Sequence, residues 1–119
     1  MVSSIKLFVA CLLPLVLAKT SSTSLTISTF TYTGGAKSYT LECKPVGGTH
    51  PYPYDACSTL KSVKGDFKSL KSSEDILCSF DYQPFTVSVI GRYKNKSVNF
   101  REVYSNQCFA IASLDGIVP

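Results

Sequence analysis

Few residues in this sequence of 119 residues could carry out catalysis. His50 is the only histidine, and it stands between Thr49 and Pro51. No serine occupies the centre of a Gly-x-Ser-x-Gly motif, so the usual pattern of a serine hydrolase is missing. Glu74 and Asp75 are adjacent, and adjacent carboxylates rarely converge on one substrate. The sequence therefore predicts a protein that is not an enzyme.

Cysteine is the other candidate for chemistry, because its thiolate binds metals and its thiol forms disulfides. The five cysteines are Cys11, Cys43, Cys57, Cys78 and Cys108. Cys43 and Cys57 flank His50 with six residues between each pair, a spacing that fits no common zinc site. The four cysteines after Cys11 predict two disulfides in an exported chain, and three pairings are open. We expect no metal and no other cofactor.

Residues 1–18, MVSSIKLFVACLLPLVLA, have the pattern of a secretory signal peptide, with Lys6 before an apolar run that ends in small residues. The run is shorter than the roughly 20 apolar residues of a membrane span. We expect cleavage to remove Cys11 with this segment. The sequence thus predicts a secreted, extracellular protein with one domain over residues 19–119 and no membrane association.

Charge indicates no nucleic-acid partner. Without Lys6, the remaining eleven basic residues outnumber the eight acidic ones by three. Four lysines recur at helical spacing, namely Lys61, Lys64, Lys68 and Lys71. They alternate with apolar residues rather than with aromatic rings that could stack on bases, so they predict a solvated helix face.

Alternating apolar and polar residues predict two strands in the first half of the domain. From Ser24 the chain alternates as far as Tyr32 and stops at Gly34-Gly35, which predicts a strand and a turn. The next strand places Tyr39 and Leu41 on one face and ends at Cys43. The first two strands should therefore be antiparallel neighbours.

A constrained loop and one helix are predicted next. Residues 44–56 hold three prolines and two glycines, which exclude a long regular element. Asp55 is the expected N-cap of an amphipathic helix from about Ala56 to Leu70. Gly65 weakens this helix, and Asp66 is expected to cap a second short turn.

The last third of the chain predicts a hairpin. Alternation from Phe85 leads to a turn at Lys94-Asn95-Lys96, and a return strand runs to Tyr104. Asn95-Lys96-Ser97 is an N-glycosylation motif, so Asn95 is a glycosylation candidate in a eukaryotic host. Cys108 and the following FAIA predict a last short strand. Together these elements predict an α+β domain: an antiparallel sheet of about five strands, with one main helix and a short one packed on one face.

The order of several motifs resembles the Streptomyces subtilisin inhibitor family. These motifs are LECKPVGGTHPYPYDAC, a helix with Gly65-Asp66, EDILC, a variable segment before Pro84, and VYSNQC. They extend from Leu41 to Cys108, about two thirds of the chain after residue 18. The resemblance implies the pairings Cys43 with Cys57 and Cys78 with Cys108, and a homodimer formed through the sheet.

The resemblance also implies a function, namely inhibition of subtilisin-type serine endopeptidases by a rigid, substrate-like loop. The peptide bond offered to the protease would be Phe80-Asp81. The implied loop residues, from P4 onward, are Leu77, Cys78, Ser79, Phe80, Asp81 and Tyr82. Asn106 would brace this loop from behind. Phe80 suits the apolar S1 pocket of subtilisins and chymotrypsin-like enzymes, so proteases that need Lys or Arg at P1 should be inhibited little.

Two residues depart from the family pattern, and the N-terminal strand region is shorter and matches the pattern poorly. Ser79 stands where a stiffening proline is common, and the carboxylate of Asp81 needs a hydrogen-bond donor if it is to be desolvated beside the scissile bond. Phenylalanine is by default a core residue, but the polar residues around Phe80 predict an exposed ring. The departures leave a second hypothesis open: a secreted binding or effector protein that keeps the fold without inhibiting a protease.

Overall fold

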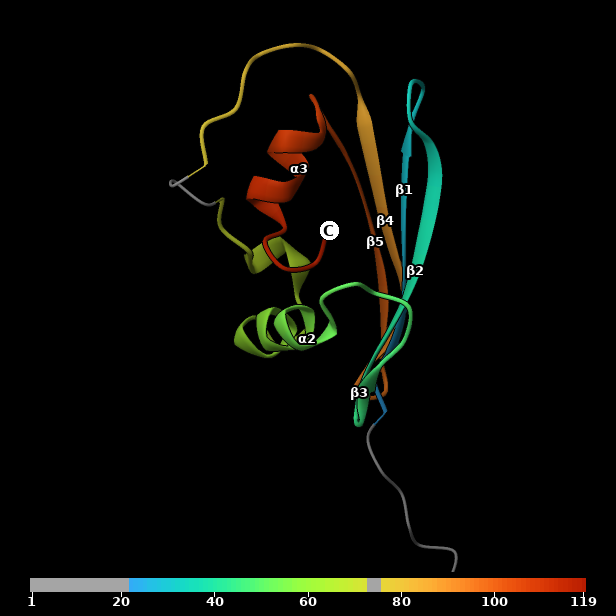
Figure 1. Ribbon diagram of the computed structural model, residues 1–119. Coiled ribbons are helices and arrows are strands. Elements are labelled where there is room, and N and C mark those ends of the chain that lie inside the picture. The colour runs from blue at the N-terminus through green and yellow to red at the C-terminus, as the bar shows by residue number, and fades with distance from the viewer. Residues whose placement is uncertain (1–21, 73–75) are drawn as a thin grey trace, which may run out of the picture.

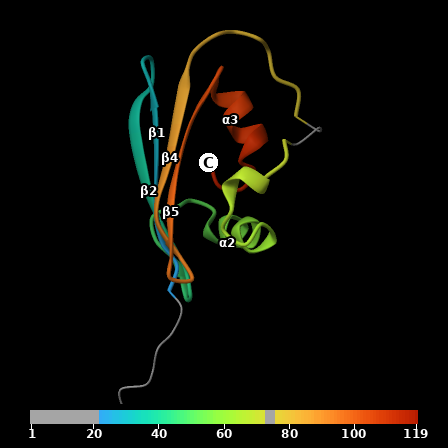
Figure 2. The same cartoon turned by 180° about the vertical axis from the view of Figure 1, so that it is seen from behind.

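The computed structural model describes residues 22–72 and 76–119. The predicted signal peptide at residues 1–18 and the acidic pair Glu74-Asp75 lie outside the described residues. Figure 1 shows two layers, a sheet and a layer of helices that covers one of its faces, and Figure 2 shows the same arrangement from behind.

The sheet has five antiparallel strands in the order β3-β2-β1-β4-β5. The strands are β1 Ser24–Thr31, β2 Gly35–Cys43, β3 Val46–Gly47, β4 Phe85–Tyr93 and β5 Lys96–Tyr104. The helices are α2 Pro53–Ser62, the 3-10 helix η3 Phe67–Ser69 and α3 Gln107–Ser113. The prediction of an α+β domain with an antiparallel sheet of about five strands is confirmed.

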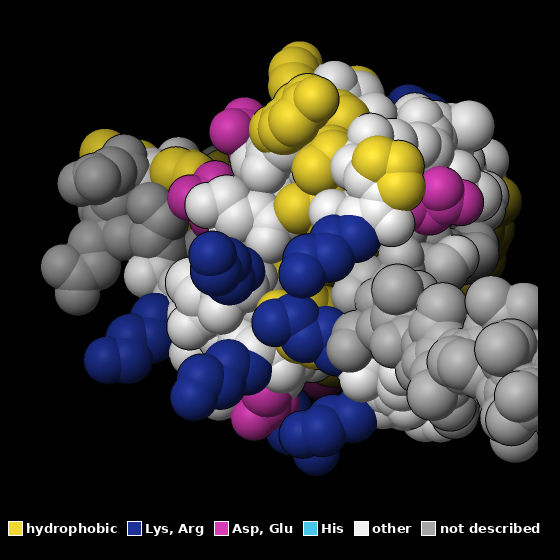
Figure 3. Space-filling model, turned by 90° about the horizontal axis from the view of Figure 1, so that it is seen from below, with side chains coloured by type: hydrophobic (Ala, Val, Ile, Leu, Met, Phe, Trp, Pro, Cys, Tyr) yellow, Lys and Arg dark blue, Asp and Glu magenta, His cyan; other side chains and the backbone are white. Residues whose placement is uncertain are grey.

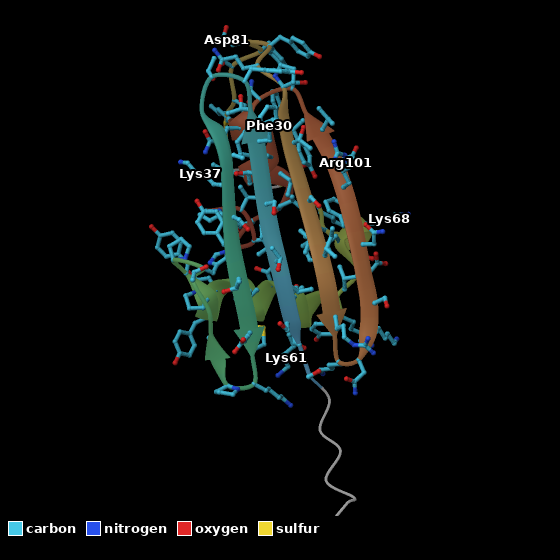
Figure 4. The ribbon with its side chains drawn as sticks, turned by 90° about the vertical axis from the view of Figure 1, so that its right-hand side faces the viewer. Phe30, Lys37, Lys61, Lys68, Asp81 and Arg101 are labelled. Atoms are coloured by element: carbon cyan, nitrogen blue, oxygen red, sulfur yellow. A yellow bond between two sulfur atoms is a disulfide. The ribbon has the colours of Figure 1, made fainter. Side chains whose placement is uncertain are left out.

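The predicted alternation explains why one face of the sheet is covered and the other is open. Leu25 and Ile27 of β1, and Val87 and Val89 of β4, point inward and are buried against the helices. The intervening residues are mostly Ser and Thr and form the outer face, which Figure 4 shows in front of the helices. Burial of the inner face drives folding.

The main helix is shorter than predicted and starts earlier. It begins at Pro53 rather than Ala56 and ends at Ser62 rather than Leu70. Asp55 lies within its first turn, so the prediction that Asp55 is the N-cap is wrong; Pro53 can start the helix because its first positions need no donor. Lys64 and Gly65 take positive φ values and end the helix. Asp66 caps the short η3 turn by accepting from the amide of Lys68, as predicted.

The predicted last strand after Cys108 is a helix instead, α3. The side chain of Asn106 accepts a hydrogen bond from the Phe109 amide at 3.1 Å and so caps the helix. A short apolar run such as FAIA does not distinguish strand from helix, and the cap decides here. The fifth strand is β3, within the segment predicted to be a loop.

The segment around Gly48 fastens the start of α2 to the sheet. Thr49 and Thr40 exchange two backbone-to-hydroxyl hydrogen bonds, at 2.8 and 3.0 Å. Gly48 has φ +100°, and a Cβ there would lie 2.3 Å from the carbonyl oxygen of Thr40, so only glycine fits. His50, predicted to be hydrogen-bonded into its surroundings, is buried; its Nδ1 accepts from the Tyr52 amide, and its Nε2–H donates to Ile117 O at 2.8 Å. The histidine thus links this segment to the chain that follows α3.

The variant His50→Ala should lower the free energy of unfolding by about 2 kcal/mol, because it leaves the buried carbonyl of Ile117 without its donor. Urea denaturation measures this change. Ser58→Ala, at an exposed helix position, is the control and should shift stability by less than about 0.5 kcal/mol. Equal stability of the two variants would contradict the proposed link.

Candidate functional site

Residues 76–84 form a loop without helix or strand that arches over one end of the molecule and enters β4 (Figure 1). Three of its large apolar side chains point into solvent: Leu77 is 95% exposed, Phe80 90% and Tyr82 77%. Phe80 is therefore not a core residue. Solvent-exposed apolar side chains grouped on one loop are typical of a surface that binds another protein.

The loop is cross-linked two residues before Phe80. Cys78 forms a disulfide with Cys108 in the first turn of α3, with 5.6 Å between the two Cα atoms. The second disulfide joins Cys43 at the end of β2 to Cys57 in α2. Both pairings that the family resemblance implied are confirmed.

Asn106 holds the loop on both sides of Phe80. Its Nδ2 donates hydrogen bonds to the carbonyl oxygen of Ser79 at 3.1 Å and to that of Asp81 at 2.8 Å. Its Oδ1 is occupied by the helix cap at Phe109, and the side chain is buried, so the amide has a fixed orientation. One side chain thus fixes the carbonyl before and the carbonyl after Phe80, while the Phe80 ring stays exposed.

Three further contacts of the loop were missed by sequence reasoning. The Gln83 amide donates to Ser105 O at 2.8 Å, which anchors the exit of the loop to the end of β5. The rings of Phe80 and Phe109 lie with centroids 6.0 Å apart, so α3 supports one side of the exposed ring. Phe109 directly follows Cys108 in the segment that the sequence predicts as a strand, and only the helix turns it toward the loop.

The third missed contact joins the side chains of the two residues on either side of Phe80. The Ser79 hydroxyl donates to the Asp81 carboxylate at 3.3 Å. The two residues that depart from the family pattern therefore interact with each other. Ser79 supplies a donor for the carboxylate, and the pair adds a restraint where a proline is absent.

The loop is held by these bonds rather than by packing. A hollow of about 240 Å³ lies between the loop and the start of α3, lined by Ser79, Asp81, Gln83, Asn106, Gln107 and Cys108. Few apolar contacts stabilise such a loop, so its shape depends on the disulfide and the hydrogen bonds.

Nearby electrostatics are mild. Burial raises the pKa of the Tyr104 hydroxyl above its usual value, and the charge of Glu102 raises it further, so this hydroxyl stays neutral around neutral pH. Within residues 22–72 and 76–119, no group of three or more His, Cys, Asp or Glu side chains is placed to hold a metal ion. No helix of the same residues is long and apolar enough to cross a membrane.

The chain is similar to known proteins in sequence. The sequence profile of a family described as "Subtilisin inhibitor-like" matches residues 19–106. A subtilisin inhibitor from Streptomyces violaceus is 41% identical over 80 residues, which cover 66% of this chain and 55% of that protein. A trypsin inhibitor from Streptomyces longisporus is 37% identical over 73 residues, which cover 60% and 51%. The chain thus spans about half the length of these curated relatives.

A similar fold is found in a crystal structure of Streptomyces caespitosus sermetstatin in complex with Bacillus licheniformis subtilisin. The TM-score is 0.68 at 24% sequence identity, and the match covers 81% of this chain and 96% of that one. At this identity the likeness concerns the fold.

The variant Asn106→Asp separates the two roles of Asn106, because aspartate keeps the acceptor for the Phe109 amide and loses the donor to the loop. We expect Asn106→Asp to keep the helix cap, seen as hydrogen-exchange protection of the Phe109 amide, whereas Asn106→Ala should lose the cap at a cost of about 1 kcal/mol. In both variants the loop should become mobile, with backbone order parameters at residues 79–81 falling from about 0.85 to below about 0.6. NMR relaxation measures this, and an unchanged loop in Asn106→Asp would contradict the bracing role.

Proposed function

The chain belongs to the subtilisin inhibitor-like family, and from this premise we propose that it is a secreted protein inhibitor of subtilisin-type serine endopeptidases. The observation that carries the proposal is the exposed Phe80, held between two carbonyls that a single buried side chain fixes. The inhibitors named among its relatives support the same target class.

The proposed contact residues follow the loop in order. Phe80 enters the S1 pocket, with Ser79 at P2, Cys78 at P3 and Leu77 at P4. Asp81 takes P1′, and Tyr82 follows it on the leaving-group side. Main-chain hydrogen bonds of an added strand supply affinity, and the alternate side chains choose the protease.

The geometry supports slow hydrolysis rather than consumption. If the protease cuts the Phe80-Asp81 bond, the acyl side stays tied through Cys78 and the carbonyl of Ser79. The amine side stays tied through the carbonyl of Asp81 and the amide of Gln83. The new amine therefore remains next to the acyl group and can attack it again, which reforms the peptide bond. A loop already held in one shape also avoids much of the entropy cost of binding.

Specificity follows from the side chain at P1. An aromatic ring fits a broad apolar pocket, whereas trypsin-like enzymes need a positive charge there. One relative is named a trypsin inhibitor, so targets differ among similar chains. With Phe80 at this position, we propose subtilisin-like and also chymotrypsin-like targets.

Further parts of the proposal concern the whole protein. We propose that residues 1–18 are removed on export and that residues 19–119 form the single inhibitor domain. Asn95 lies in the exposed turn between β4 and β5, where a glycan could be attached in a eukaryotic host.

The open outer face of the sheet carries the exposed side chains of Phe30, Ile90 and Val103, and we propose it as the surface of a homodimer.

Titration of subtilisin with the purified protein should give stoichiometric loss of activity, and trypsin should be unaffected. Phe80→Gly should weaken inhibition of subtilisin by at least about 2 kcal/mol, roughly 30-fold, because it removes the anchor of the interface. Tyr52→Gly removes another exposed aromatic side chain, one that precedes α2 and lies outside the loop and the proposed dimer surface; it is the control and should inhibit like the parent. Rapid cleavage after Phe80, or no inhibition by the parent, would support the second hypothesis, a binding or effector protein that keeps the fold.

Removing one disulfide at a time tests the tethering mechanism. The bridges join cysteines that are 30 and 14 residues apart in sequence. Each removal should therefore lower the free energy of unfolding by a similar amount, about 3 to 4 kcal/mol. Below the melting temperature of both variants, Cys78→Ser with Cys108→Ser should turn the protein into a substrate cut at Phe80. Cys43→Ser with Cys57→Ser should still inhibit. Chromatography of the reaction products with subtilisin decides, and equal cleavage of both variants would contradict the mechanism.

A further inference from the structure

The end of the molecule opposite the loop carries a groove between α2 and the turn that joins β4 to β5. Two hollows, of about 420 and 350 Å³, share Lys61, Tyr93 and Lys94 as walls. We call the combined feature the basic groove. Its lysines are Lys44, Lys61, Lys64, Lys94 and Lys96. Figure 3 looks at this end and shows Lys and Arg side chains gathered there.

The groove concentrates positive charge from three separate parts of the chain. Lys44 follows β2, and Lys61 and Lys64 lie in and just after the last turn of α2. Lys94 follows β4, and Lys96 begins β5. None of the described residues that line the two hollows is acidic. Like charges held close together repel one another, and a bound polyanion would relieve this repulsion.

The helix dipole of α2 explains only part of this lysine cluster. Lys61 lies in the last turn of α2, where a positive charge is favourable with the helix dipole. That effect ends within the last turn and gives no reason for lysines from two other segments to line the same hollow. Lys94 is exposed and lies over the groove wall, with Nζ 5.5 Å from the centre of the Tyr93 ring.

We propose that the basic groove binds an acidic polysaccharide. Tyr54, 74% exposed, lines the hollow beside Lys61 and offers a flat apolar face to a sugar ring. The exposed hydroxyl group of Ser58 lies in the same wall and can hydrogen-bond sugar hydroxyls. The lysines meet the sulfate or carboxylate groups of the polymer.

Other polyanions fit the groove less well. Single-stranded nucleic acid is bound by several aromatic rings on which successive bases stack, and Tyr54 is the one exposed aromatic residue among the described residues lining the groove. A membrane surface calls for an apolar face that enters the lipid, and the groove offers lysines instead.

The groove and the loop can be occupied at the same time. Figure 4 shows Lys61 and Asp81 at opposite ends of the sheet. Each end also has its own disulfide: Cys43 and Cys57 line the groove, and Cys78 holds the loop. The proposal goes beyond inhibition and would anchor the protein to a matrix while the loop stays free.

Isothermal titration with a heparin oligosaccharide of defined length tests the proposal, with protein made in a bacterial host so that Asn95 carries no glycan. The variant Lys61→Ala with Lys94→Ala removes the two lysines shared by both hollows. Lys37→Ala with Arg101→Ala removes the same net charge at two exposed positions that Figure 4 shows away from Lys61. Thermal melting checks that both variants fold.

We expect the groove variant to bind heparin roughly tenfold more weakly and to lower the slope of log affinity against log salt by about two. The control should bind within about twofold of the parent. Tyr54→Ala should weaken binding without changing the salt slope, because it removes a stacking face and no charge. Absence of binding by the parent, or equal losses in both charge variants, would overturn the proposal. Tighter binding of a thymidine oligonucleotide, with no effect of Tyr54→Ala, would overturn it in favour of nucleic acid.

Discussion

The candidate site depends on one constraint: the amide of Asn106 must meet the two carbonyls that flank Phe80. The loop has a hollow beneath it rather than packed side chains, so hydrophobic burial cannot define its shape. Directional bonds define it instead, and a buried donor is well suited because its bonds do not compete with water. The same side chain caps α3, so the orientation of the amide is fixed by the helix it starts. A loose helix end would mean a loose loop.

The fold provides the rigid support that this constraint needs. The four long strands pair along their whole length, and the inner face of β1 and β4 is buried under the helices. Leu114 and Ile117, after α3, are fully buried, and His50 binds the carbonyl of Ile117. The C-terminal side of α3 is therefore fastened to the core, and its N-terminal side, with Asn106 and Cys108, carries the loop. Tyr104 on β5 pairs with Phe85 on β4, so both strand ends next to the loop are joined as well.

The sequence predicted the features that local patterns determine. Period-two alternation gave the long strands, and the family motifs gave the disulfides, because a cysteine framework is a property of the family rather than of any local rule. The boundaries of α2 were wrong because Pro53 can start a helix as well as exclude one, and because the turn at Lys64 overrides the apolar spacing that continues to Leu70. The strand predicted after Cys108 is wrong because Asn106 caps a helix there, and a short apolar run does not distinguish strand from helix. Phe109 and the basic groove escape prediction because their partners are distant in sequence. The helical spacing of Lys61, Lys64, Lys68 and Lys71 predicts a solvated helix face instead, but α2 ends at Ser62.

The basic groove and the loop at opposite ends of the sheet should act independently. Coupling between sites requires an element with two arrangements that both sites bias. The element that connects the groove to the loop is the sheet, whose ladder is continuous and whose core side chains are buried. Close packing of this kind resists rearrangement. Charge could still couple the ends through space, but they are separated by the length of the nine-residue strand β4, on the order of 30 Å. That distance exceeds the Debye length of about 8 Å at physiological salt, so a polyanion in the groove would be screened from the carboxylate of Asp81. Occupancy of the groove should therefore determine where the protein is held, while the residues around Phe80 would determine which protease the proposed inhibitor binds.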